Sequence, residues 1–404
     1  PPGDSRRDAG FTIFYMGINL GSFLGALVCG WLGESESFGW HYGFGAAGVG
    51  MLFGLIQYRL TLSNLGDAGR LPTLDPSNPE DARKMTRGGV AVGLALGVIT
   101  LAVLGAFFGV YTIDALLMAK VLGIVILVVA LLYFFYILAF GQLDDVETRR
   151  MIVVVVLFFA AATFWSGFEQ AGSSLNLFAE RYTDRMVMDF EIPASWFQSL
   201  NAFFIFTIAP FVAAFWVWLA KRNLEPSTPF KFAIGLIFLA LGFVTMIGAS
   251  MLVAAGSKVL PTWLIMTYLL HTLGELTLSP VGLSATTKLA PKRFVGQMMG
   301  IWFLATSFGS LISGLVAGTF DAENIQAYPG QYLNIVLFIG GAGVLMLLFV
   351  KPIKNMMGGV KLQTHTLSDL HGQDAALTAA RITGTGVGSG FHGRTDRRIL
   401  AAGN

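Results

Sequence analysis

Apolar residues form long stretches along most of the chain, separated by short polar segments. A stretch of about 20 apolar residues is long enough to cross the hydrocarbon core of a bilayer as a helix. The pattern predicts ten membrane-spanning helices, over residues 11–33, 40–60, 88–113, 116–140, 151–179, 195–219, 230–254, 260–286, 296–319 and 332–350. These stretches lack the alternation of apolar and polar positions that is typical of transmembrane β-barrel strands. We therefore expect an all-α polytopic membrane protein.

Positive residues are distributed unevenly between the two sets of connections. One set of alternate connections holds 17 Lys and Arg residues, whereas the opposite set holds four, Lys120, Arg181, Arg185 and Lys258. Lys and Arg concentrate in the cytoplasmic connections of membrane proteins. The sequence therefore predicts that residue 1 and the C-terminal segment both lie on the cytoplasmic side.

Composition excludes several other classes of protein. Charged residues make up 12% of the 404 residues, against about 25% in soluble domains, and hydrophobic residues make up 54%. The net charge of +2 argues against a nucleic-acid-binding protein. The single cysteine excludes a disulfide framework and a multi-cysteine metal site. No phosphate-binding GxxxxGK[ST] motif is present, so the sequence gives no sign that ATP hydrolysis drives the protein.

Two carboxylates interrupt the predicted spans. Glu169 lies in FWSGFEQAGSS, and Glu275 lies in HTLGELTLSPVGLS. Because a charged side chain at the centre of a bilayer costs about 2.5–3.5 kcal/mol on insertion scales, each needs a reason to be there. Pro280 is expected to disrupt the helix near Glu275, and irregular backbone at membrane depth normally lines a cavity. We therefore favour a proton or substrate site in a water-filled cavity over a structural carboxylate satisfied by a neighbouring helix.

Other polar and Trp side chains occur within the predicted spans, several of them spaced by one helical turn from each other or from the two carboxylates. They are Asn19, Trp165, Gln198, Asn201, His271, Ser279, Trp302 and Thr306. Each taken alone is explained by a hydrogen bond between helices or, for Trp, by the membrane interface. Their recurrence on several spans favours one shared polar cavity. His271 lies one turn before Glu275 and has two interpretations, a proton relay or a hydrogen bond between helices.

Four segments of the chain closely resemble the proton-dependent oligopeptide transporter family of the major facilitator superfamily. They are FTIFYMGINLGSF, FWSGFEQAGSSLNLFAER, SWFQSLN and GELTLSPVGLSATTKLAPKRFVGQMMGIWFLATSFGS. The resemblance implies the major facilitator fold, which has twelve core helices in two six-helix bundles, often with two helices inserted between the bundles in prokaryotic members. The ten predicted spans then correspond to core helices five to twelve and the inserted pair.

The resemblance and the local composition together predict five parts of the chain. Residues 1–60 end the N-terminal bundle, 61–87 form a cytoplasmic linker, 88–140 are the inserted helix pair, 151–350 form the C-terminal six-helix bundle, and 351–404 are a disordered cytoplasmic tail. The family's first four helices, which carry a Glu-x-x-Glu-Arg motif, have no counterpart in this sequence. We therefore expect the chain to be the downstream part of a longer transporter.

The resemblance also implies an activity. We expect symport of di- and tripeptides with protons by alternating access, driven by the proton gradient without a cofactor, in the cytoplasmic (inner) membrane of a bacterium. The expected partners are peptides, protons and the lipid bilayer, with no nucleic acid, and the expected state is a monomer. The alternatives are a major facilitator carrier of another small solute and a transport-inactive fragment or receptor. An enzyme is not expected.

Individual roles follow from the same resemblance. Asn19 and Asn201 are implied to hold the peptide backbone and termini, and Glu275 to meet the peptide amino terminus and take part in salt-bridge switching. Glu169 is implied to be the proton-linked acid, and Asp184 to be a gate acid on the outer side. The implied pocket wall consists of Trp165, Ser279, Trp302 and Thr306. No catalytic or metal-binding residues are expected.

Overall fold

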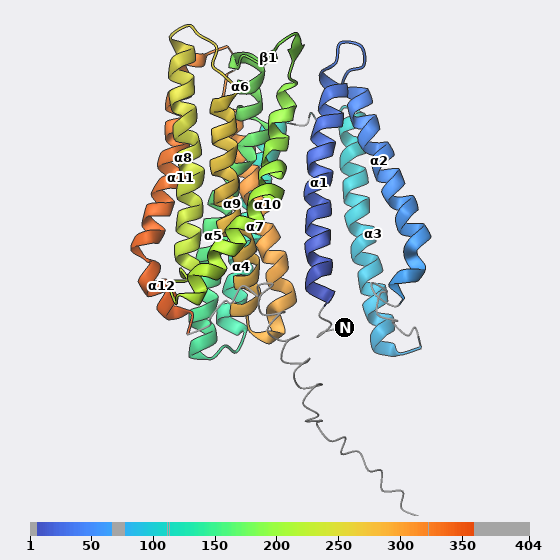
Figure 1. The fold of residues 1–404 in the computed structure, drawn as a ribbon. Coiled ribbons are helices and arrows are strands. Elements are labelled where there is room, and N and C mark those ends of the chain that lie inside the picture. Colours follow the sequence, from blue (N-terminus) through green and yellow to red (C-terminus); the bar gives the residue numbers. More distant parts are fainter. Residues whose placement is uncertain (1–5, 67–76, 111, 113, 322, 359–404) are drawn as a thin grey trace, which may run out of the picture.

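The protein is almost entirely helical in a computed structural model that describes residues 6–66, 77–110, 112, 114–321 and 323–358, with the backbone alone for 6–16 and 115. Long helices lie side by side, and the start of α1 and the short α12 lie at the same end of the molecule (Figure 1). The α-helices are α1 Arg6–Glu34, α2 Trp40–Thr61, α3 Pro79–Phe107, α4 Ala115–Phe140, α5 Asp145–Phe168, α6 Ser174–Tyr182, α7 Ser199–Lys221, α8 Thr228–Ala254, α9 Thr262–Leu289, α10 Val295–Ala317, α11 Tyr328–Leu348 and α12 Val350–Met356.

Short elements connect these helices. The 3-10 helices are η1 Leu62–Leu65, η2 Glu169–Gly172, η3 Ala194–Gln198, η4 Lys292–Phe294 and η5 Ile325–Ala327. Strands β1 Met186–Val187 and β2 Phe190–Glu191 form an antiparallel hairpin in which Met186 pairs with Glu191. The hairpin lies at the end of the molecule opposite to α12 (Figure 1).

The expectation of an all-α membrane protein is confirmed. Within the described part of the chain, seven helical segments are long and apolar enough to cross a membrane: Pro79–Phe107, Leu116–Phe140, Asp145–Tyr182, Ala194–Lys221, Thr228–Ala254, Lys292–Ala317 and Ile325–Leu348. Each of the ten predicted spans overlaps a helix, but α1, α2 and α9 fall outside those seven. The number of ten spans therefore stays a prediction.

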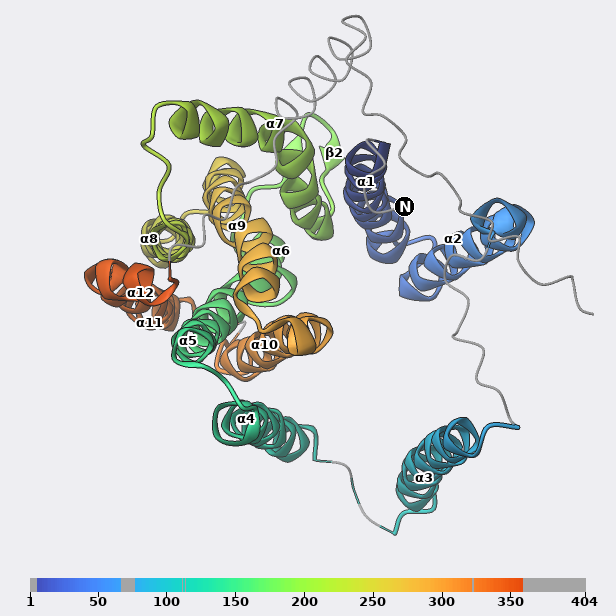
Figure 2. The same ribbon diagram turned by 90° about the horizontal axis from the view of Figure 1, so that it is seen from below.

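Helices α5 and α7–α11 form the main bundle (Figure 2). Helix α8 packs along both α9 and α11, and α5 contacts α8, α9 and α10. Their shared interior is filled by buried apolar side chains, among them Phe164, Leu239, Phe243 and Tyr332. Helix α1 packs against α7 on the bundle surface and carries α2 on its other side.

The two helices between α2 and α5 differ in their packing. Helix α4 lies against α10 and α5: Phe134 meets Phe158 edge to face at 5.4 Å, and Tyr133 donates a hydrogen bond of 2.8 Å to Gln297. Helix α3 stands apart in the view along the helices (Figure 2). None of its described side chains is buried, and no packing interface between α3 and another described helix is found. Of the two helices of the predicted inserted pair, α4 therefore packs against the bundle and α3 does not.

The predicted span over residues 151–179 lies within one helical segment, Asp145–Tyr182, which contains an interruption that the apolar pattern did not predict. Helix α5 ends at Phe168, the chain turns through η2, and α6 begins at Ser174. The turn contains Gly172 and Ser173, which have low helix propensity. It is also stabilised locally, because the Gln170 side chain accepts a hydrogen bond of 2.7 Å from the Ser174 hydroxyl.

Two predicted boundaries also differ from the structure. Helix α3 begins at Pro79, inside the predicted linker, because Asn78 caps it by accepting a 2.9 Å hydrogen bond from the Glu80 amide and proline suits the first helical position. The predicted disordered tail begins instead with α12, whose Ile353 is buried. Residues 67–76 of the linker and 359–404 of the tail lie outside the described residues.

Candidate functional site

The predicted amide and carboxylate meet between α7 and α9. Asn201 lies in the first turn of α7, and its Nδ2 donates hydrogen bonds of 2.9 Å to Glu275 Oε2 and 3.1 Å to Thr272 Oγ1. Thr272 lies on α9 and donates its own hydroxyl proton to the Tyr268 carbonyl, at 2.8 Å. Both protons of the Asn201 amide are therefore used, which fixes its orientation. Among the described residues, no Lys or Arg forms an ion pair with Glu275.

The backbone near Glu275 is regular. Helix α9 continues from Thr262 to Leu289 through Pro280, so the expected disruption of the helix is wrong. A proline lacks the N–H that would bond the carbonyl four residues earlier, at Leu276, but a single missing bond need not break a long helix that is packed on both sides. Glu275 and its amide partner therefore lie beside a continuous helix rather than a broken one.

Glu169 lies at the break between α5 and α6, where its side chain is exposed. Glu169 directly precedes Gln170, which is hydrogen-bonded to Ser313 of α10, and α5, which leads into this turn, packs against α9, the helix of Glu275. The two predicted carboxylates, which are far apart in the sequence, therefore belong to one region of the bundle. Two buried polar atoms with no partner in the described chain, Trp165 Nε1 and Ser279 Oγ, are on the same helices.

The side chains of Asn19 and Trp302 are buried, unlike that of Glu169. Asn19 is buried on α1 at 6% exposure. Trp302 is 5% exposed, and its indole meets Phe232 edge to face at 6.4 Å. It also fills the space beside Gly282, where an added Cβ would lie 2.1 Å from the ring. In this conformation Trp302 packs as a core side chain.

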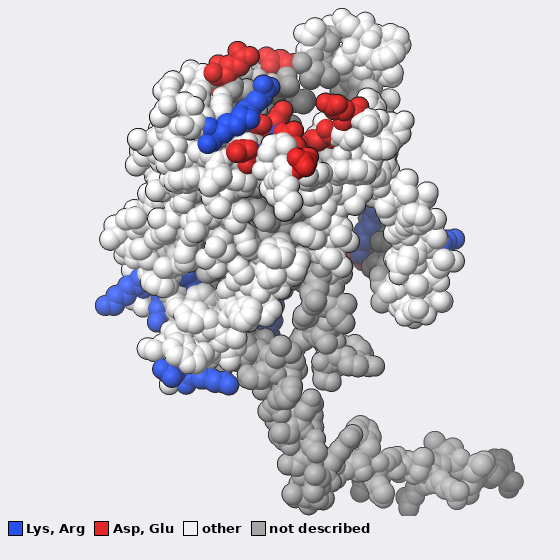
Figure 3. Space-filling model, turned by 45° about the horizontal axis from the view of Figure 1, so that its top comes forward, with Lys and Arg blue, Asp and Glu red and all other residues white. Residues whose placement is uncertain are grey.

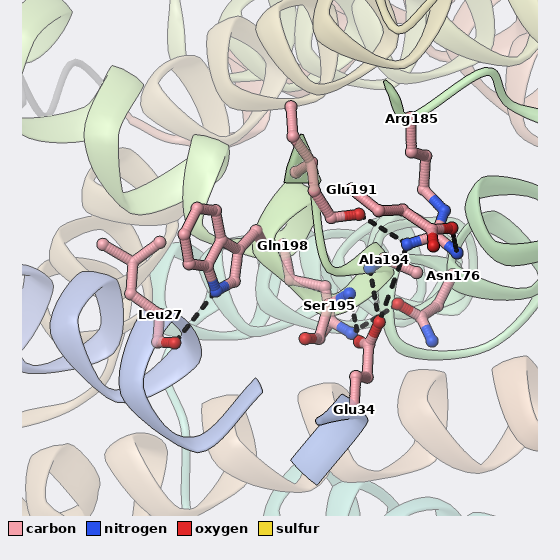
Figure 4. Close-up of polar contacts among 10 residues, drawn as sticks. Leu27, Glu34, Asn176, Arg185, Glu191, Ala194, Ser195 and Gln198 are labelled. Carbon is pink, nitrogen blue, oxygen red and sulfur yellow. Dashed lines mark hydrogen bonds and ion pairs between the residues drawn. The ribbon is translucent and has the colours of Figure 1, made fainter. Parts of the chain in front are cut away.

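Glu34 joins α1 to the segment before α7, a contact that the sequence analysis missed (Figure 4). Its carboxylate accepts hydrogen bonds from the backbone N–H groups of Ala194, at 2.7 Å, and Ser195, at 2.8 Å. Arg185 lies 3.8 Å from the same carboxylate and 2.8 Å from Glu191. The carboxylate thus satisfies the free amides at the start of η3, which is the favourable position for a negative charge.

Two further contacts support the same junction. The Trp196 indole donates a 2.9 Å hydrogen bond to the Leu27 carbonyl of α1. Gly30 allows a close approach, because an added Cβ would lie 2.0 Å from Ser195 Oγ. By contrast, Asp184 is exposed and accepts a local hydrogen bond of 3.3 Å from the Met186 amide. The acid that connects α1 to the segment before α7 is therefore Glu34 and not Asp184.

Charge differs between the two ends of the molecule. Acidic side chains gather at the end that carries β1 and β2, while most of the visible basic side chains lie toward the other end (Figure 3). The exposed acidic residues in α6 and the connections at the first end are Glu36, Asp114, Glu180, Asp184, Asp189, Glu191, Asp321 and Glu323. Within the described residues, no group of three His, Cys, Asp or Glu side chains is placed to hold a metal ion.

Known proteins share both the sequence and the fold. The sequence model of the POT family matches residues 1–64 and 113–334. The chain is 41% identical over 367 residues to peptide transporter YePEPT of Yersinia enterocolitica, covering 90% of this chain and 71% of that protein. It is 33% identical over 368 residues to a di-/tripeptide transporter of Lactococcus lactis, covering 89% and 71%.

Solved structures agree with these sequence matches. The fold is similar to that of peptide transporter POT in complex with sulfate, with a TM-score of 0.78 and 38% identity over 89% of this chain and 70% of that one. A variant of that transporter in complex with alafosfalin gives a TM-score of 0.76 at 38% identity. These structures have the major facilitator fold, so the predicted fold class is confirmed. The chain belongs to the POT family.

Proposed function

We propose that this protein carries di- and tripeptides across a membrane together with protons, by alternating access. The observation that carries the proposal is the Asn201–Glu275 pair, which presents an oriented amide beside a carboxylate within a POT-family bundle. Relatives named as peptide transporters and as di-/tripeptide transporters support the substrate class. Membership of a transporter family rather than an enzyme family fits this role.

The chemistry of the site suits a peptide. A zwitterionic peptide offers an ammonium group at one end and amide groups along its length, and a carboxylate with a neighbouring amide binds such groups by charge and hydrogen bonds. Glu275 would receive the ammonium group, and the side chains of Asn201 and Asn19 would hold the backbone and termini. Trp165, Ser279, Trp302 and Thr306 would form the wall of the pocket.

Glu169 would carry the transported proton. Its carboxyl group is exposed at a helix break that follows α5, and α5 packs against α9, the helix of Glu275, so a change in its charge would act on the group that binds the substrate. The proton gradient then drives uptake, and no cofactor is needed.

The Glu34 junction would close the outer end of the transport path. It joins α1, of the N-terminal bundle, to the start of the α7 segment. Access to the outer side requires these bundles to separate, and so requires this contact to break. We assign the outer-gate role to Glu34 with Arg185, in place of Asp184.

The orientation follows from charge. The acidic end that carries β1 and β2 would face outward, and the basic end with α12 would face the cytoplasm (Figure 3). The protein would then lie in the cytoplasmic membrane of a bacterium, as a monomer, with its C-terminal segment inside.

Uptake in proteoliposomes tests the function. The full-length protein is reconstituted with an inward proton gradient, and labelled dipeptide uptake is competed with tripeptide, amino acid and nitrate. Peptide transport predicts accumulation that collapses with a protonophore and is competed by tripeptide only. Competition by nitrate or by single amino acids would favour a carrier of another solute. Binding of dipeptide without uptake in the full-length protein would favour a receptor.

A further inference from the structure

Gln170 follows Glu169 in the turn between α5 and α6, and every hydrogen-bonding position of its amide is used. The side chain is fully buried. Its Nε2 donates to the Ser313 carbonyl at 2.9 Å and to Ser313 Oγ at 3.0 Å. Its Oε1 accepts from the hydroxyls of Ser174, at 2.7 Å, and Ser173, at 3.3 Å. An amide has two donors and two acceptor positions, so this one is saturated.

The Gln170 side chain connects three pieces of backbone. Ser173 and Ser174 lie at the start of α6, Gln170 itself lies in η2, and Ser313 lies on α10. Ser313 is 2% exposed and Ser174 is 1% exposed, so water cannot replace these bonds. The broken helix is therefore tied to α10 at the point where it is broken.

The same region of α10 packs against η2, which begins at Glu169. Glu169 and Gln170 are adjacent in η2, so the bonds from Gln170 to Ser313 also hold the backbone of Glu169 in place. The orientation of η2 relative to α10 thus decides where the Glu169 carboxyl points.

Helices α5 and α10 are also in close contact at Gly309, about one turn before Ser313 on α10. An added Cβ on Gly309 would lie 2.5 Å from the Ala162 carbonyl and 2.7 Å from Trp165 Cβ. This contact fixes the distance between α5 and α10, while the Gln170 amide fixes the rotation of the turn that follows. Helix α10 also carries Trp302 and Thr306, which the proposed function places in the pocket wall.

We propose that Gln170 is a positioning residue for Glu169. It holds the turn against α10, so that the proposed proton-carrying carboxyl keeps a fixed place relative to the helix that lines the proposed peptide pocket. This positioning role rests on the proposed function in one respect. Only if the protein carries peptides with protons does Gln170 couple proton movement to peptide accumulation. It does not require Gln170 to contact the peptide or the proton.

The test is Gln170→Met in the full-length protein, since Met has a similar length without hydrogen-bonding capacity. We expect proton-driven dipeptide accumulation to fall about tenfold or more, because a misplaced functional group can cost up to about 100-fold in rate, while exchange of internal for external dipeptide falls much less, since the proposal gives Gln170 no contact with the peptide. The dependence of uptake on external pH should also change shape, since the surroundings of Glu169 have changed.

The matched control is Gln331→Met. Gln331 of α11 donates a 2.5 Å hydrogen bond to the carbonyl of Thr319, just after the end of α10, and no hydrogen bond between Gln331 and η2 is found among the described residues. We expect this variant to keep the wild-type ratio of accumulation to exchange and the wild-type pH profile. A proportional loss of both activities in Gln170→Met, with an unchanged pH profile, would reduce Gln170 to a structural role.

A second measurement separates this inference from the function itself. Hydrogen exchange of the backbone amides in residues 170–175 should speed up in Gln170→Met while exchange in α8 stays unchanged. This readout needs no transport, so it stands even if the wild-type protein carries another solute. Unchanged exchange in residues 170–175 would overturn the positioning role, whereas failure of wild-type peptide uptake would overturn only the proposed function.

Discussion

The side-chain amide of Asn201 on α7 donates a 2.9 Å hydrogen bond to the carboxylate of Glu275 on α9. The two residues are 74 positions apart in the sequence. The bond orients the carboxylate without neutralising it, because an amide brings no charge. A cationic group of a substrate would therefore meet a carboxylate that already has a fixed direction.

Glu275→Gln should cripple dipeptide uptake, by about tenfold or more, while leaving the fold intact. The glutamine oxygen can still accept the Asn201 hydrogen bond, so the change removes the charge and keeps the shape. The measurements are uptake in proteoliposomes and thermal unfolding of the purified protein. Glu180→Gln, the same change at an exposed position of α6, is the control. Wild-type uptake by Glu275→Gln would place Glu275 outside the mechanism.

Glu169→Gln should produce a more selective defect. Accumulation driven by the proton gradient should be lost, because the side chain can no longer carry a proton, while peptide exchange should be partly retained because Glu275 still binds the substrate. Parallel assays of driven uptake and of counterflow distinguish the two activities. Equal loss of both would contradict the separate roles of the two carboxylates.

Glu34→Gln should loosen the junction between α1 and η3. A hydrogen bond to a charged group contributes about 1.5–3 kcal/mol, so the amides of Ala194 and Ser195 should exchange with solvent about tenfold faster or more. Hydrogen exchange of the 192–199 segment measures this. Glu36→Gln removes an exposed carboxylate two residues away and should leave that segment unchanged. Equal protection in both variants would show that Glu34 does not hold the junction.

Gly309→Ala should destabilise the bundle by about 1–3 kcal/mol, the usual cost of overpacking. The added methyl would collide with the Ala162 carbonyl, and backbone cannot move aside as a flexible side chain can. Gly314→Ala on the same helix meets nothing within 4 Å and should be neutral. Unfolding midpoints in detergent compare the two, and equal midpoints would contradict the close contact between α5 and α10.

Much of the fold could be predicted because apolar length is a property of the sequence alone. Each predicted span overlaps a helix, and two residues of the predicted polar cavity, Asn201 and Glu275, form a hydrogen bond. The break at Glu169–Gly172 was missed because apolar residues continue on both sides of it. The broken region is held by side-chain hydrogen bonds of Gln170, to Ser313 of α10 and from Ser173 and Ser174 in its own turn, which hydropathy does not report.

Glu34 could not be found by motif or hydropathy. A carboxylate at the end of an apolar stretch is normally solvated, and its partners here are backbone amides about 160 positions later. Backbone groups have no sequence signal of their own. Asp184 attracted attention because its position resembles a family acid, although in the structure it bonds within its own turn.

Helix α3 has no buried side chain, so packing places few constraints on which apolar residues it can carry. Each of its apolar positions needs only to dissolve in lipid, so Leu, Ile, Val and Phe should replace one another freely there in related genes. Helix α4 has shape constraints, since Phe134 and Gly123 fit against neighbours. Aligned relatives should therefore show drifting sequence with steady hydropathy along α3, and fixed residues along one side of α4.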